Sequence, residues 1–307
     1  MGSAAKAVVC IVTPGTRSAN NGNWRTAARW AQMLRDRYEV IVQTEWRGEP
    51  VDAMVALHAR RSASSIEAFR QSRTGRLAVV LTGTDLYHDL PESAEAVRSL
   101  AAADRLIVLQ EEALRLLAPA ARRKATVIFQ SAPHVARRAK PRDRLDCVAV
   151  GHLREEKDPR TLFGAWSRLP RDAPIFMRHI GAPLDAALAR EARALAKRDP
   201  RYRYSGALPH GLARAAIARA HVLVHPSIAE GGANVIVEAV TAGTAVIASR
   251  ISGNVGMLGA GYPGYFSVGD ESGLSRCLVQ ALDERGYLRA LKAGCASRRA
   301  LSRHAIR

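Results

Sequence analysis

The sequence predicts an α/β protein made of two doubly wound domains, each built around a parallel sheet. Three observations support this prediction. Short β-prone apolar runs alternate with helical patterns along most of the chain, a charged stretch near the middle interrupts the alternation, and 307 residues are enough for two separate cores. Such alternation favours parallel strands joined by right-handed crossovers. We expect ligands in the cleft that faces the carboxyl ends of both sheets.

The first half of the chain opens with the apolar run 8–13, a loop rich in glycine and asparagine, and a helical pattern. In that pattern Trp24, Ala28, Ala31 and Leu34 form one apolar stripe, as a period of 3.6 residues requires. Further strands are predicted at 39–43, 53–57, 77–82, 105–109 and 126–129, with helical stretches between most of them.

The second half follows residues 134–146, a charged and proline-containing stretch without apolar periodicity that indicates a linker. Strands are then predicted at 147–150, 175–179, 202–205, 222–224, 245–248 and 264–267. Helices are predicted at 159–168, 184–198, 209–219, 234–242 and 272–284. The expected domains are therefore 1–138 and 139–290, and a final helix over 291–307 is expected to pack back on the first domain.

Charge narrows the expected partners only in part. The chain has 46 Lys and Arg residues against 28 Asp and Glu, a net charge of +18, which suits nucleic acid, an anionic membrane surface or phosphorylated small substrates. Aromatic residues make up 5% of the chain and show no aromatic-basic pattern, so nucleic acid is not the expected partner. Much of the charge is equally explained by an arginine-rich composition, because the arginines are spread along the chain.

Apolar patterning and cysteine spacing exclude further classes. No apolar run approaches the roughly 20 residues of a membrane span, so no membrane partner is expected. The N-terminus reads directly into the first strand, without the features of an export signal, and we expect a cytoplasmic protein. The cysteines at 10, 147, 277 and 295 are widely scattered, which predicts neither a disulfide framework nor a metal site.

The most specific motif lies within residues 227–249. Glu230 and Glu238 are eight positions apart, about two helical turns, and so lie near the same helical face. At the helix start between them, accessible backbone N–H groups and the helix dipole favour an anion such as a diphosphate. The residues that supply this helix start are Gly231, Gly232, Ala233 and Asn234. Taken alone, the residues also allow a glycine-rich helix start with Glu238 in a solvated ion pair.

This segment resembles the E-x7-E signature of the retaining glycosyltransferases of family 4. An apolar strand ending in Pro-Ser precedes it, and a helix, Gly243 and a further strand follow it. The resemblance implies the GT-B fold, in which two Rossmann-like domains face a central cleft. It also implies that Glu230 contacts the sugar of a nucleoside diphosphate donor and that Glu238 contacts the ribose.

Residues 148–166 resemble the start of the C-terminal domain in the same family, a strand followed by Gly-Arg-Leu and a Lys six residues after the Gly. Lys157 falls on the family's Lys, and as a mobile cation it can neutralise a departing diphosphate without a metal. The family's Arg position holds His152, and Arg154 can supply the missing positive charge. Gly151 and His152 are expected at the donor, and no metal or other cofactor is expected. A solvated Lys at a helix start remains the alternative for Lys157.

The acceptor side is expected at the strand ends of the first domain. The loop 14–25 is rich in Gly and Asn, as a backbone that approaches a ligand closely would be, and its arginines can bind a phosphate-like group as a fork. In the segment 81–90, Thr82 stands where the family often has a His, and His88 is a nearby candidate. A lone His such as His58 is more often structural than catalytic. The acceptor candidates are Gly15, Thr16, Arg17, Asn21, Gly22, Asn23, Arg25, His58, Arg60 and Asp85.

Five segments together, 13–30, 57–63, 81–87, 150–159 and 225–239, resemble the selenosugar synthases of selenoneine biosynthesis. This resemblance spans nearly the whole chain and implies a UDP-sugar donor of the GlcNAc or Glc type, selenophosphate as acceptor and a 1-seleno-sugar as product. A small trianionic acceptor suits the arginines at 17, 25, 60 and 61, whereas a lipid acceptor would require an exposed apolar surface. The open alternatives are a family 4-like enzyme with another small-molecule or lipid acceptor, a nucleic-acid-binding protein, and a non-catalytic nucleotide-sugar sensor.

Overall fold

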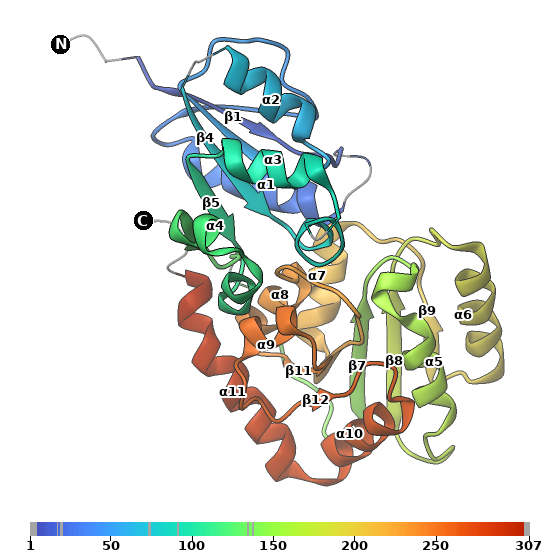
Figure 1. Ribbon diagram of the computed structural model, residues 1–307. Coiled ribbons are helices and arrows are strands. Elements are labelled where there is room, and N and C mark those ends of the chain that lie inside the picture. Colours follow the sequence, from blue (N-terminus) through green and yellow to red (C-terminus); the bar gives the residue numbers. More distant parts are fainter. Residues whose placement is uncertain are drawn as a thin grey trace. The chain divides into compact units, whose positions relative to one another are not determined.

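The computed structural model describes residues 5–303 except 17, 19, 20, 73, 74, 91, 134 and 137, and describes side chains up to residue 299. The chain divides into two compact units (Figure 1). Of the described residues, unit 1 contains those up to Gln130 together with Glu230–Asn234, and unit 2 contains those of 131–229 and of 235–303. Each unit holds one parallel six-stranded sheet, which confirms the predicted α/β class.

The sheet of unit 1 has the strand order β2-β1-β3-β4-β5-β6. Its strands are β1 (Val8–Val12), β2 (Glu39–Gln43), β3 (Ala53–Leu57), β4 (Arg76–Leu81), β5 (Arg105–Val108) and β6 (Ala125–Val127). The helices are α1 (Gly22–Leu34), α2 (Ala63–Gln71), α3 (Ala94–Ala102) and α4 (Pro119–Arg123), with short turns η1 (Asp85–Asp89) and η2 (Glu111–Leu116).

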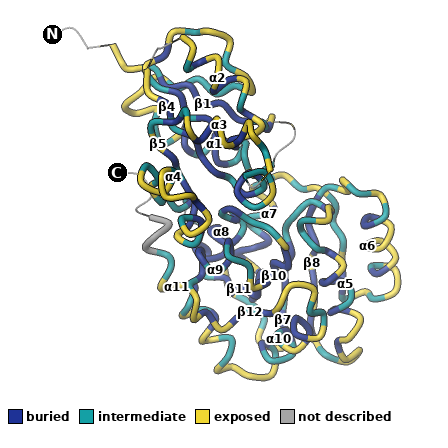
Figure 2. Tube along the Cα trace, viewed as in Figure 1, coloured by how far each residue is buried: buried dark blue, intermediate teal, exposed yellow. Residues whose placement is uncertain are grey.

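Alternation along the strands divides the core of unit 1 between the two faces of its sheet. Val9 and Ile11 of β1 pack in the same cluster as Trp30 of α1. Cys10 and Val12 point to the opposite face, where the cluster includes residues of α2 and α3. Figure 2 shows the strands buried beneath helices whose outer faces are exposed. The sheet is therefore covered on both sides, which explains why its strands read as continuous apolar runs.

The sheet of unit 2 has the order β12-β11-β10-β7-β8-β9. Its strands are β7 (Leu145–Val150), β8 (Ile175–Ile180), β9 (Tyr202–Tyr204), β10 (Val222–His225), β11 (Ala245–Ser249) and β12 (Tyr265–Phe266). The helices are α5 (Pro159–Ser167), α6 (Ala186–Arg198), α7 (His210–Arg219), α8 (Asn234–Ala242), α9 (Ser252–Leu258), α10 (Glu271–Asp283) and α11 (Arg285–Arg303), and η3 (Glu155–Lys157) is a single turn.

Three features of this architecture differ from the sequence prediction. The boundary between the units falls after Gln130 rather than after residue 138. Helix α9 was not predicted, and α11 begins at Arg285, before the expected start at 291. Within unit 2, Arg298 donates to the carbonyl oxygen of Met257 at 3.1 Å and Arg299 to that of Val240 at 3.2 Å. The described part of α11 thus packs on unit 2, and the expected return of 291–307 to the first domain stays a prediction.

Two further observations concern the helices and the cysteines. In the described part of the chain, no helix combines the length and the apolar character that crossing a membrane requires. The four cysteines are free thiols, and burial raises the pKa of Cys10 to about 11. At neutral pH the Cys10 thiol is therefore protonated and packs as a small apolar side chain.

A buried histidine makes the stability of the fold depend on pH. His179 in β8 is 4% exposed, and its Nδ1 atom lies 2.7 Å from the Tyr202 hydroxyl. Burial lowers the pKa of His179 from 6.5 to about 4, so between these values the unfolded chain binds the proton more readily than the folded chain. The contribution of the neutral His179 ring to the stability of the fold is therefore complete above pH 6.5 and is lost as the pH falls. Acidification from pH 7 to pH 4 should therefore lower the free energy of unfolding by roughly 3 kcal/mol through His179.

Denaturant unfolding across this pH range measures the effect as a difference between wild type and His179→Phe. The variant should lose a correspondingly smaller part of its stability on acidification, because it has no imidazole to protonate. Equal pH dependence in the two proteins would show that His179 does not titrate in this way.

Candidate functional site

In unit 2, the two motifs singled out in the sequence follow neighbouring strands. The chain winds from β7 through β8 to β9 in one direction across the sheet and from β10 to β12 in the other. The adjacent carboxyl ends of β7 and β10 therefore form the point at which the strand order reverses, where open α/β sheets bind their ligands. Residues 151–158 follow β7, and residues 226–233 follow β10.

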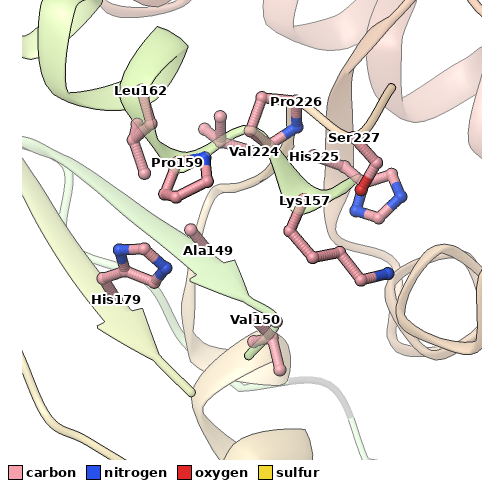
Figure 3. Close-up of a pocket in the computed structure, with 11 residues that line it drawn as sticks. Ala149, Val150, Lys157, Pro159, Leu162, His179, Val224, His225, Pro226 and Ser227 are labelled. Carbon is pink, nitrogen blue, oxygen red and sulfur yellow. The ribbon is translucent and has the colours of Figure 1, made fainter. Parts of the chain in front are cut away.

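The two loops meet through a backbone hydrogen bond in which Ile228 N donates to Glu156 O at 3.0 Å. Figure 3 shows the Lys157 side chain near His225 and Ser227, at the end of β10. Together with Gly151 these residues line a cavity of about 20 Å³, which is enough for roughly one water molecule. The fold thus brings Lys157 and Gly151 of one motif beside the residues that lead into the other.

Local turn geometry holds the backbone of Lys157. The residue ends the turn η3, where Lys157 N donates to Arg154 O at 3.0 Å. Asp158 follows in the left-handed region with φ 44°, a conformation that Asp tolerates better than most residues, and its Oδ1 atom caps α5 by accepting from Thr161 N at 3.2 Å. The base of the Lys157 side chain is therefore fixed.

His152 and Arg154 have different surroundings within the same loop. His152 Nδ1 accepts a hydrogen bond from Ala182 N at 3.0 Å, so the neutral ring carries its proton on Nε2. The Arg154 side chain is 44% exposed, with its Nε atom 3.8 Å from the carboxylate of Glu156. An exposed pair at that distance contributes little, so Arg154 retains the freedom to reorient towards a stronger anion.

Glu238 lies in α8 and is only 8% exposed. Its Oε1 atom lies 2.6 Å from His210 Nε2, the first residue of α7. His210 was not among the residues predicted from the sequence, because it precedes Glu238 by 28 positions and belongs to neither motif. A pattern search could have found it only as a polar residue directly after Pro209 at a helix start.

Residues 230–234 group with unit 1. Glu230 is partly exposed, and Gly231, Gly232 and Ala233 lead from it to Asn234, the first residue of α8. A side chain at Gly231 would collide with the backbone of Thr82 and Gly83, since a Cβ atom there would lie 2.6 Å from Gly83 N. Gly231 is therefore required by a close backbone approach as well as by an open helix start.

Unit 1 has its own reversal point, between β1 and β3. The loop after β1 holds Gly15, Thr16 and Asn21, and the first turn of α1 holds Gly22, Asn23 and Arg25. Asn21 caps α1, since its Oδ1 atom accepts from Trp24 N at 3.0 Å. The Asn21 side chain also fills the space that a Cβ atom of Gly15 would need. Arg17 lies outside the described residues.

The loop after β3 contains His58, which adopts φ 74° and is 1% exposed. Its Nε2 atom lies 2.9 Å from Thr84 Oγ1, and burial lowers the pKa of the ring. Asp89 Oδ2 lies 3.8 Å from this nitrogen and 3.0 Å from Arg60 Nε. A non-glycine residue held in the left-handed region costs about 1–3 kcal/mol and is often found at functional sites. Thr84 and Asp89 were not predicted as partners of His58, although both lie in the segment 81–90.

Asp85 has a structural environment. It is fully buried, and its Oδ1 atom accepts from Thr82 N at 2.9 Å, Gly83 N at 2.8 Å and Leu86 N at 3.1 Å. Its Oδ2 atom accepts from Ala59 N at 3.0 Å. The four hydrogen bonds hold the loops after β3 and β4 together, and a contact of Asp85 with the acceptor stays a prediction.

Metal binding was not expected from the sequence. Within the described ranges, no three His, Cys, Asp or Glu side chains gather as a metal site would require. The expectation that no metal is needed stays a prediction.

The family model described as "Glycosyl transferases group 1" matches residues 132–293, just over half of the chain. A search of curated protein sequences found no match to this chain. Among solved structures, sucrose-phosphate synthase from Thermosynechococcus elongatus is similar with a TM-score of 0.75 and 16% identity, over 96% of this chain and 94% of that one. HepE from Anabaena, in complex with UDP and glucose, gives a TM-score of 0.73 and 14% identity over 96% and 94%.

A third similar structure is the α,α-trehalose-phosphate synthase from Burkholderia xenovorans in complex with glucose-6-phosphate. Its TM-score is 0.65 and its identity 17%, over 95% of this chain and 76% of that one. These similarities show the GT-B fold that the sequence motifs implied.

Proposed function

Because the chain belongs to the family described as glycosyl transferases group 1, we propose that it transfers a sugar from a UDP-sugar to selenophosphate and forms a 1-seleno-sugar. The observation that carries the donor half of this proposal is the meeting of the two motif loops at the reversal point between β7 and β10. The choice of nucleotide is supported by the similar HepE structures, which are complexes with UDP and with UDP-glucose.

In this proposal, the residues that follow β7 and β10 bind the nucleotide. The diphosphate lies at the start of α8, where the N–H groups and the helix dipole stabilise its charge. Glu238 accepts hydrogen bonds from the ribose hydroxyls, and Lys157 neutralises the charge that develops on the leaving diphosphate, assisted by Arg154. Gly151 and His152 line the donor site, and Glu230 accepts hydrogen bonds from the hydroxyl groups of the sugar.

The acceptor half of the proposal rests on the sequence resemblance and on charge. Arg60 is 46% exposed and is oriented by Asp89 at the strand ends of unit 1, and Arg25 lies in the first turn of α1. Guanidinium groups bind phosphate-like anions as a fork, which suits a small trianion better than a neutral alcohol. Backbone and amide groups for the same anion come from Gly15, Thr16 and Asn21 of the loop after β1 and from Gly22 and Asn23 of α1.

The proposed reaction has two steps, glycosyl transfer to selenium and hydrolysis of the Se–P bond. Selenium of selenophosphate forms a bond to the anomeric carbon as the bond from that carbon to the UDP oxygen breaks, and the electron pair leaves with UDP. Water then hydrolyses the Se–P bond and releases phosphate and the 1-seleno-sugar. Because selenophosphate is already a strong nucleophile, the protein contributes orientation and charge neutralisation rather than a general base.

The test is to incubate the purified protein with UDP-GlcNAc and freshly generated selenophosphate, with UDP-glucose in a parallel reaction. We expect UDP release that depends on selenophosphate, together with a seleno-sugar mass. Inorganic phosphate in place of selenophosphate is the matched control and should give no such product. UDP release with a plain alcohol or a lipid, and none with selenophosphate, would overturn the acceptor assignment and favour a family member with another acceptor.

A further inference from the structure

The carboxylate of Glu238 is buried, and its position therefore needs an explanation in terms of a partner. Its side chain is 9% exposed, and burial of an ionised carboxylate is unfavourable unless a partner compensates for the lost water. His210 supplies that partner through Nε2, which lies 2.6 Å from Oε1. The distance is typical of a charge-assisted hydrogen bond, which is shorter and stronger than one between neutral groups.

Hydrogen bonds fix the positions of α7, which carries His210, and α8, which carries Glu238. Thr244, which follows α8, donates from Oγ1 to the carbonyl oxygen of Ile217 in α7 at 2.7 Å. Arg214 of α7 donates to the carbonyl oxygen of Pro133 at 2.5 Å, which ties the same helix to the segment that precedes β7. Pro209 restricts the backbone directly before His210. The imidazole is thus presented to Glu238 by a rigid frame rather than by a mobile loop.

We propose that His210 is a positioning residue for the nucleotide of the donor. It donates from Nε2 to Oε1 of Glu238 and so holds the carboxylate in one orientation. An ionised carboxylate has about four lone-pair sites, so one such bond leaves the other sites to accept the ribose hydroxyls. This inference rests on the proposed ribose contact of Glu238, and it adds a residue that belongs to neither sequence motif.

The experiment compares the dissociation constants of UDP and 2′,3′-dideoxy-UDP, which lacks the ribose hydroxyls, by calorimetry on the full-length protein. We expect His210→Ala to weaken UDP binding about tenfold, the usual scale for a hydrogen bond to a charged group, and dideoxy-UDP binding less than twofold. His210→Gln, which keeps a donor, should restore most of the selectivity. Leu212→Ala replaces an exposed residue of the same helix and should leave both constants unchanged.

Glu238→Gln separates this inference from the proposed function. If that variant still discriminates UDP from dideoxy-UDP as wild type does, the ribose contact itself is wrong. If it loses discrimination while His210→Ala and His210→Gln both keep it, the positioning role of His210 is overturned. Equal weakening of both ligands in the two His210 variants would also overturn it, because a general structural defect does not distinguish the sugars. In a Glu238→Gln background, His210→Ala should have no further effect on selectivity.

Discussion

Lys157→Ala should lower kcat for UDP release by roughly 10²- to 10³-fold, the range observed when one group that stabilises transition-state charge is removed. The donor KM should change much less, because the charge on the diphosphate grows as the glycosidic bond breaks and the ammonium group stabilises that later charge most. Steady-state kinetics with a coupled assay for UDP measures both constants.

Two further lysine variants make this result specific. Lys157→Arg retains the charge but replaces a compact ammonium with a planar group, so partial activity is expected. Lys197→Ala removes an exposed lysine from α6 and should leave kcat unchanged. A kcat within about threefold of wild type for Lys157→Ala would contradict the leaving-group role, since such a change is below 1 kcal/mol.

Glu230→Gln should lower turnover at saturating donor by roughly 10- to 100-fold, which corresponds to the loss of one charge-assisted hydrogen bond. The substitution keeps the shape of the side chain and removes the negative charge that favours the hydroxyl groups of a sugar whose anomeric carbon becomes cationic. The dissociation constant of UDP should be unchanged, because UDP lacks the donor sugar.

The control for this variant is Glu111→Gln, which makes the same chemical change at an exposed position of η2. Wild-type turnover in Glu230→Gln at saturating donor would show that the sugar contact is assigned to the wrong residue. Weakened UDP binding in the same variant would instead place Glu230 at the nucleotide.

The strands were predictable because burial on both faces makes each of them a short apolar run. All five residues of β11 are buried, for example, and the predicted and observed spans nearly coincide. Helix α9 carries two glycines and little helix propensity, so its local sequence argues against a helix. Arg298 of α11 donates to the carbonyl oxygens of Met257 at 3.1 Å and Gly256 at 2.8 Å, and such contacts made by a distant element hold the helix in place.

The candidate site was predictable only where one continuous segment carries the chemistry. The motifs located Lys157 and Glu238 and their strand-end loops because those residues have fixed spacings within single segments. The partners His210 and Asp89 lie on other elements, and only folding brings them to Glu238 and His58. The sequence also does not distinguish a carboxylate that accepts backbone N–H groups, as Asp85 does, from one that contacts a ligand.

The most direct test of the central claim is hydrogen–deuterium exchange of the whole protein with and without UDP. If the nucleotide binds at the reversal point of unit 2, protection should be concentrated in residues 151–158 and 226–238, while α6 should exchange at the same rate in both samples. Protection confined to other segments, or none in a sample that calorimetry shows to be saturated with UDP, would contradict the assignment of the donor site.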